Sequence, residues 1–144
     1  MDLERLFGIC NALAAVGWLT LLGSRFFPVL AQRVSALAIP LLLAVAYAGL
    51  VLAFWNRASG GFDSLSSVMQ LFTQREIALA GWIHYLAFDL LLGAWQVRVA
   101  ERERIGFLLV VPCLLLTFLF GPAGFLAFTA LRLARAVVPN PTAA

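Results

Sequence analysis

Long stretches without charged side chains alternate with short charged segments along the chain. A helix of about 20 residues, rising about 1.5 Å per residue, crosses the roughly 30 Å of hydrocarbon in a bilayer. Four stretches approach or exceed that length, and only the third is interrupted, by His84 and Asp89. The four stretches cover residues 6–24, 34–56, 77–97 and 105–131. The pattern predicts an all-α fold, an integral membrane four-helix bundle that forms a single transmembrane domain over residues 1–144.

The connecting segments differ in character. Residues 25–33 are predicted as a short turn, and residues 98–104 as a helix extension followed by a turn. Within the longer connection, apolar residues recur at helical spacing over residues 62–72, and Asp63 or Ser64 can cap the first turn. This segment predicts a short amphipathic helix that lies in the membrane interface, either as a lid over the bundle or as a plain connector.

Charge distribution adds little about orientation. Four spans would place both termini on one side of the membrane, here called side A, with the opposite face called side B. Ten arginines and no lysine divide evenly between the two sides, so the positive-inside rule gives no direction. They flank the spans and form no basic run, which argues against a nucleic-acid partner.

Composition narrows the class of protein further. Hydrophobic residues make up 63% of the chain and charged residues 12%, which excludes a soluble domain of this length, a disordered chain or a disulfide scaffold. Cys10 and Cys113 fall at different predicted depths, so no disulfide is expected between them. The first stretch follows an acidic start and no cleavage site follows it, so it is interpreted as a retained span.

The last apolar stretch contains helix breakers. Proline removes an N–H and bends a helix, so Pro122 should free the carbonyl of Phe118, four residues earlier, near the centre of the bilayer. Pro112 should act similarly nearer side B. The bends serve either close helix packing or the opening of a cavity.

Two residues of the third stretch carry the candidate chemistry. A carboxylate inside hydrocarbon is costly and marks a functional site by default, so Asp89, near mid-membrane, is predicted as a general acid. His84, nearer side A, can accept or relay a proton. At 100° per residue the two lie about 140° apart on the helix, so they cannot pair directly. An interhelical hydrogen bond that only locks the bundle is the alternative for each.

The depth of other residues suggests their surroundings. A polar cluster is expected from Asn11, His84, Tyr85, Asp89 and Thr117, beneath the 62–72 segment. Aromatic side chains and the freed carbonyl would line the path of an apolar substrate. The predicted substrate-binding residues are Asn11, Trp82, Tyr85, Phe88, Trp95, Thr117 and Phe118.

Several kinds of chemistry find no support in the sequence. One histidine without a cysteine pair predicts no metal site, and no strand, glycine-rich turn and helix form a nicotinamide or flavin motif, so no cofactor is expected. No nucleophile motif indicates a hydrolase. A transporter or channel subunit would require repeats or an oligomer. Acid–base chemistry on an apolar ligand remains, as does binding of such a ligand alone.

Specific strings place the chain near a known family. The sequence resembles the abscisic-acid-deficient-four-like membrane family over most of residues 7–128. The similar segments are Gly60–Phe72, Gly81-Trp-Ile-His-Tyr-Leu-Ala-Phe-Asp89, Gly93-Ala-Trp95 and Val111–Gly124, together with Asn11, Trp18 and Pro28.

The resemblance implies a role in carotenoid metabolism. Plant members act in the conversion of violaxanthin to neoxanthin, a redox-free isomerisation in which an epoxide opens while an allene and a hydroxyl form. It implies an isomerase acting on a xanthophyll or related polyene lipid. The roles of Asp89 as acid and His84 as base follow from their depth in the predicted membrane and not from the resemblance. A non-catalytic module that binds a carotenoid or a membrane-protein partner is the alternative, and a homo-oligomer is compatible with either. The expected location is a bacterial inner membrane, or a plastid membrane for a processed plant-type protein.

Overall fold

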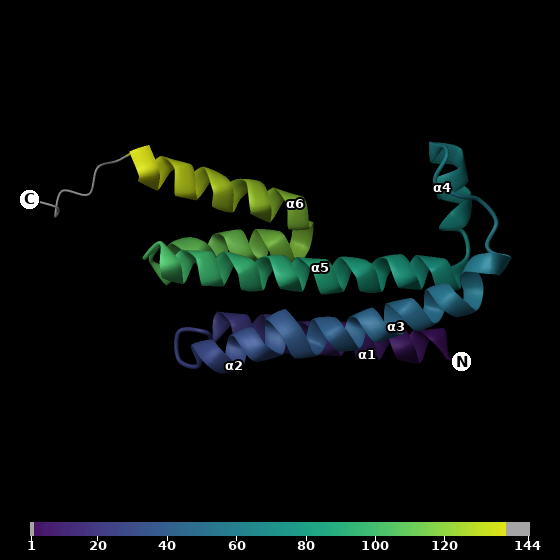
Figure 1. Cartoon of the computed structure of the whole chain (residues 1–144), viewed down its shortest axis with the longest axis horizontal. Coiled ribbons are helices and arrows are strands. Elements are labelled where there is room, and N and C mark those ends of the chain that lie inside the picture. Colours follow the sequence, from purple (N-terminus) through teal and green to yellow (C-terminus); the bar gives the residue numbers. More distant parts are fainter. Residues whose placement is uncertain (1, 138–144) are drawn as a thin grey trace, which may run out of the picture.

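The computed structural model describes residues 2–137, which are helical apart from short connections. Figure 1 shows long helices side by side, with their axes nearly parallel. Three of the long helices are α1 (Leu3–Leu22), α5 (Arg75–Arg102) and α6 (Phe107–Val137). The fourth long element runs from Pro28 to Arg57 and is called the rod below. By length and composition, four segments are apolar enough to cross a membrane, and the chain is a membrane protein.

The second apolar segment starts earlier than the sequence predicted. Helix α2 (Pro28–Arg33), the π-helical turn η1 (Val34–Ala38), α3 (Ile39–Phe54) and the 3₁₀ turn η2 (Trp55–Arg57) follow one another without a break. The predicted turn over residues 25–33 is therefore wrong for its last six residues, which are helical. Proline is favourable in the first turn of a helix because its missing N–H would have no partner there, and Pro28 occupies that place.

Helix α5 forms the centre of the molecule. It lies between α6 on one side and α1 and α3 on the other (Figure 1). Just over half of its most apolar part is buried inside the protein, whereas a third or less is buried in each of the other long segments. Its last turn, up to Arg102, confirms the predicted helix extension after the third apolar stretch.

The fourth apolar stretch does not cross the bundle in one piece. The backbone leaves helical geometry at Phe120, with φ −146° and ψ 56°. Figure 1 shows that the chain turns back there, so an outward arm (107–119) and a return arm (121–137) lie along the same half of α5. Arg132 Nε donates to Glu103 Oε2 at 2.7 Å, which ties the return arm to the end of α5 where α6 began.

This reversal corrects two predictions. The outward arm, at about 1.5 Å per residue, is only about 20 Å long and cannot span the hydrocarbon. The stretch 105–131 is therefore a re-entrant hairpin rather than a fourth crossing of a four-helix bundle. The described end of α6 lies at side B, opposite the start of α1, whereas both had been expected on side A (Figure 1).

The amphipathic connector was predicted correctly as a helix. Helix α4 (Leu65–Leu71) is shorter than expected, and Ser64 caps it by accepting from the Ser67 N–H at 3.1 Å. It lies across the bundle axis, beside the first turns of α5 at the side A end (Figure 1). Phe62, Leu65 and Met69 leave most of their surface exposed. The other end of the segment packs against α5, because Leu71 is buried and a Cβ at Gly81 would meet the Phe72 ring.

Candidate functional site

The break in α6 creates polar backbone positions at mid-bundle. A reversal at membrane depth leaves carbonyl and N–H groups without helical partners, and such backbone is tolerated only where protein surrounds it. The Tyr85 hydroxyl lies 3.2 Å from the Phe118 carbonyl and 3.1 Å from the Leu119 carbonyl, to which it donates. The predicted release of the Phe118 carbonyl is confirmed, and Tyr85 is the residue that satisfies it.

Asp89 lies one helical turn beyond Tyr85, against the start of the return arm. Its side chain is 92% buried, and its Oδ2 has no hydrogen-bond partner among the described residues. A Cβ added at Gly121 would approach within 2.9 Å of Oδ2 and closer still to Oδ1, so only glycine allows this contact. The carboxyl group therefore faces the N-terminal end of a half-helix, which favours negative charge.

A second close approach holds the two arms of the hairpin together. A Cβ at Gly124 would overlap the backbone of Thr117. Thr117 is fully buried, donates its hydroxyl to the Cys113 carbonyl at 2.8 Å and accepts from Gln96 Nε2 at 2.9 Å. Thr117 thus joins the outward arm to α5. The contact with Asp89 that the sequence analysis expected is not formed.

Two predicted residues meet nearer side A. Asn11 Oδ1 accepts from the Trp82 indole N–H at 3.1 Å, and Asn11 Nδ2 donates to the Phe7 carbonyl at 2.8 Å. The Trp82 ring lies 6.0 Å from the Phe7 ring and 5.2 Å from the Tyr85 ring. A line of aromatic side chains therefore leads along α5 toward Asp89.

The structure does not bring His84 to Asp89. His84 is exposed on the other face of α5, where its ring stacks on Phe88 at 4.4 Å and lies 5.8 Å from Tyr47 of α3. The angle of about 140° between the two residues on the helix already predicted this separation. The α6 break lies on the Asp89 face of α5 and not on the His84 face. The single polar cluster expected from five residues is wrong, because His84 lies on the other face of α5 and Thr117 pairs with Gln96. Phe88, a predicted substrate-binding residue, lies with His84.

The remaining aromatic prediction lies in the packing of the hairpin. Trp95 lies 5.8 Å from Phe125 and 5.6 Å from Phe128, both on the return arm, whereas Phe118 packs edge-on against Trp18 at 5.5 Å. Phe118 therefore lies at the break, and Trp95 serves the packing of the return arm.

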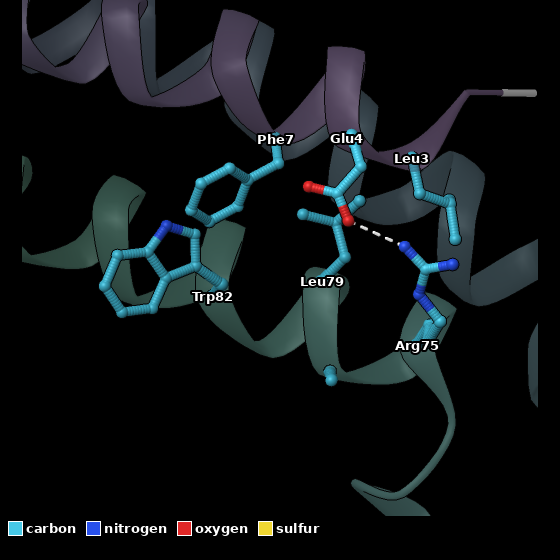
Figure 2. A pocket seen from close by; sticks show the side chains of 7 residues that line it. Leu3, Glu4, Phe7, Arg75, Leu79 and Trp82 are labelled. Carbon is cyan, nitrogen blue, oxygen red and sulfur yellow. Dashed lines mark hydrogen bonds and ion pairs between the residues drawn. The ribbon is translucent and has the colours of Figure 1, made fainter.

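Sequence reasoning missed two residues of this region. Gln96 is a buried amide inside an apolar stretch, and that polarity was itself a signal of an interhelical bond. Glu4 accepts from Arg75 Nη2 at 2.7 Å and lines a hollow of about 350 Å³ between the starts of α1 and α5 (Figure 2). Its exposed position near the start of the chain gave no such signal.

The described residues contain no group of three or more histidine, cysteine or acidic side chains placed to hold a metal ion. Cys10 and Cys113 are both free and buried. The only titratable side chain buried at the break is Asp89, with Tyr85 beside it. The arrangement places a buried carboxyl group one helical turn from a tyrosine hydroxyl, which is a setting for proton transfer.

A helical hairpin around a buried carboxyl group, among helices long and apolar enough to cross a membrane, defines a small polytopic membrane protein with a polar site at mid-bundle. The match to a family model refines this class: residues 5–128 match the model described as ABA DEFICIENT 4-like. The chain belongs to that family, which is associated with neoxanthin synthesis in plants. No curated protein and no solved structure shows significant similarity to the chain.

Proposed function

We propose that this protein is a membrane-embedded isomerase that acts on a xanthophyll or a related polyene lipid, with Asp89 as the proton-transferring group. The observation that supports it most directly is the free Oδ2 atom of a buried carboxyl group at the α6 break. A group held without a partner in an apolar setting is available to a substrate. The family's association with neoxanthin synthesis supplies the class of ligand.

One carboxyl group can balance the proposed reaction. The protonated Asp89 carboxyl donates its proton to the epoxide oxygen as a C–O bond breaks. The carboxylate then removes a proton from the neighbouring chain carbon, whose electron pair completes the allene. The product is an isomer with one new hydroxyl, and Asp89 ends protonated as it began. No electrons leave the substrate, and His84 is not required.

Tyr85 has a positioning role in this proposal. Its hydroxyl holds the two carbonyls at the break, and its ring lies beside the carboxyl group on the same face of α5. The start of the return arm favours the carboxylate that forms when the proton leaves. These contacts fix the position along α5 at which the reacting ring of the substrate would bind.

The test compares Asp89→Asn with Asp63→Asn, the same change in the interfacial connector. Purified protein in liposomes receives violaxanthin, and the pigments are separated and weighed by mass spectrometry. Wild type and Asp63→Asn should yield an allenic isomer of unchanged mass, while Asp89→Asn should lower the rate by at least about 100-fold. Full conversion by Asp89→Asn would refute the role of Asp89. Loss of conversion in His84→Ala would restore a separate base.

A second candidate, a non-catalytic carotenoid-binding module, is favoured by one observation. The contact between Asp89 and Gly121 resembles a cap on the return arm, which would stabilise the hairpin without chemistry. This candidate predicts that pigment binds to wild-type protein and is recovered unchanged. A failure of conversion together with retained binding in the experiment above would select it.

A further inference from the structure

The hairpin of α6 covers the side B half of α5 and leaves the side A half without that cover, where Phe72 packs on Gly81. Both arms of α6 lie along the half of α5 nearer Arg102, and neither reaches the half that begins at Arg75 (Figure 1). In that open half Phe7 and Trp82 keep about two fifths of their surface exposed. Between the starts of α1 and α5 lies the hollow of about 350 Å³, next to the same two rings.

Figure 2 shows how the hollow is built. The rings of Phe7 and Trp82 lie at one end, Leu3 and Leu79 form apolar walls, and the Glu4–Arg75 ion pair closes the other end. An apolar chamber that ends in an exposed ion pair suits a ring bearing a hydroxyl group. The ring can bury its carbon atoms while the hydroxyl exchanges hydrogen bonds with the carboxylate and guanidinium.

The hollow and the α6 break lie on one line. Arg75 and Asp89 are 14 residues apart on one helix, which corresponds to about 21 Å at 1.5 Å per residue. The rings of Phe7, Trp82 and Tyr85 follow each other along this distance at separations of 6.0 and 5.2 Å. Aromatic faces pack well against flat, conjugated chains.

We propose that the hollow at Glu4 and Arg75 binds the distal, hydroxylated ring of an elongated polyene whose reacting ring lies at Asp89. The inference rests on the proposed function and adds a direction to it: the chain of the ligand runs from the break toward side A, along Trp82. The ligand class is an extended apolar molecule with a polar ring at each end. Length is therefore a determinant of specificity.

A second groove makes the direction testable. It lies on the side B half of the same α1 face, has about 250 Å³, and is lined almost entirely by apolar atoms, including those of Ala15 and Trp18. It offers a distal hydroxyl no polar partner. Ala78 lines the side A hollow and Ala15 the side B groove, so Ala78→Phe and Ala15→Phe are matched blocks of the two directions.

The experiment measures quenching of tryptophan fluorescence by violaxanthin and by retinol, which has one ring and about half the chain, on protein in nanodiscs. Ala78→Phe should weaken violaxanthin binding by about tenfold or more and leave retinol binding within about twofold. Ala15→Phe should leave both unchanged. Arg75→Met, which adds no bulk, should weaken violaxanthin binding several-fold and spare retinol.

Three results would overturn the proposal. These are unchanged violaxanthin binding in Ala78→Phe and Arg75→Met, equal weakening of both ligands, or a selective loss in Ala15→Phe, which would send the chain toward side B. Violaxanthin binding with the expected selectivity but without conversion would defeat the isomerase and retain the hollow. Conversion that depends on Asp89 but ignores Ala78→Phe would retain the isomerase and defeat the hollow.

Discussion

The two halves of this molecule use the same central helix in different ways. Toward side B, α5 is surrounded by α1, the rod and both arms of α6, and its polar side chains are buried in pairs such as Gln96 with Thr117. Toward side A, the α6 arms are absent and a hollow opens beside Phe7 and Trp82 (Figures 1 and 2). The side B half, called here the closed half, is packed by α1, the rod and α6, whereas the side A half, called here the open half, has an accessible hollow.

Asp89 lies where the two halves meet. Its carboxyl group touches the start of the return arm, and Tyr85 and Trp82 lead away from it into the open half. A site at such a boundary gains precise positioning from packed backbone on one side and admits a ligand from the other. The comparison therefore depends first on whether the hairpin turns back.

The largest expected effect concerns topology. In protein whose native cysteines are replaced by serine, Arg135→Cys should react with a membrane-impermeant maleimide from the same side as Arg104→Cys. It should be protected on the side where Arg57→Cys reacts. The reason is that the return arm brings Arg132 to Glu103 at the side B end. Labelling of Arg135→Cys from the same side as Arg57→Cys would show that α6 crosses the membrane. It would contradict the packing of both α6 arms along the side B half of α5.

The next effect concerns the glycine contact inside the hairpin. Gly124→Val should destabilise the protein by about 3 kcal/mol, because its Cβ would overlap the backbone of Thr117 and neither arm can move without exposing the break. The measurement is thermal unfolding in detergent followed by circular dichroism. Gly49→Val is the matched control, since a Cβ there meets nothing within 4 Å. Equal melting temperatures for the two variants would mean that the arms are loosely packed.

A smaller effect separates the buried polar pair from its surroundings. Thr117→Val should cost about 1–2 kcal/mol because it leaves the Gln96 amide buried without its partner. Adding Gln96→Leu should recover part of that loss, since an apolar pair needs no hydrogen bond. The same unfolding assay measures both. Additive losses in the double variant would show that the two side chains do not act as a pair.

The hydrophobic pattern predicted the helices well, because the apolar stretches that are buried in lipid or protein can be read from one sequence. It could not distinguish a crossing from a hairpin. Residues 105–131 are equally apolar in either case, and Pro122 indicates a bend without its angle. The reversal depends on contacts between distant residues, those of Gly121 with Asp89 and of Arg132 with Glu103.

The candidate site was predicted in part for the same reason. Depth along a helix placed Asn11 near the level of His84, and the freed Phe118 carbonyl near the level of Asp89, because rise per residue is fixed. The structure pairs Asn11 with Trp82 and the carbonyl with Tyr85, which lie within about one turn of those levels. Rotation about the helix axis decided the rest. This rotation places His84 on the opposite face of α5 from Asp89. The spacing of the two residues already predicted the rotation, whereas their similar depth had suggested that they belong to one cluster. Glu4 was missed because its partner is 71 residues away.

The smallest expected effect concerns the ion pair that ties the return arm to α5. Hydrogen bonds from Arg132 hold the pKa of the Glu103 carboxyl below its ordinary value. A carboxyl group with a lowered pKa in the folded state stabilises the fold at neutral pH and loses that contribution as pH falls through its folded-state pKa. The pair is partly exposed, so Glu103→Gln should lower the melting temperature at pH 7 only slightly, and less than Thr117→Val does.

The pH dependence distinguishes this tie from other losses of stability. The difference in melting temperature between wild type and Glu103→Gln should be present at pH 7 and shrink toward zero in acid, where the wild-type carboxyl is protonated. Glu101→Gln serves as control, because Glu101 is exposed on the neighbouring turn of α5. A difference that stays constant from neutral to acidic pH would mean that the charge of Glu103 does not hold the return arm. The return arm would then be held by its contacts at Gly121, Gly124 and Trp95.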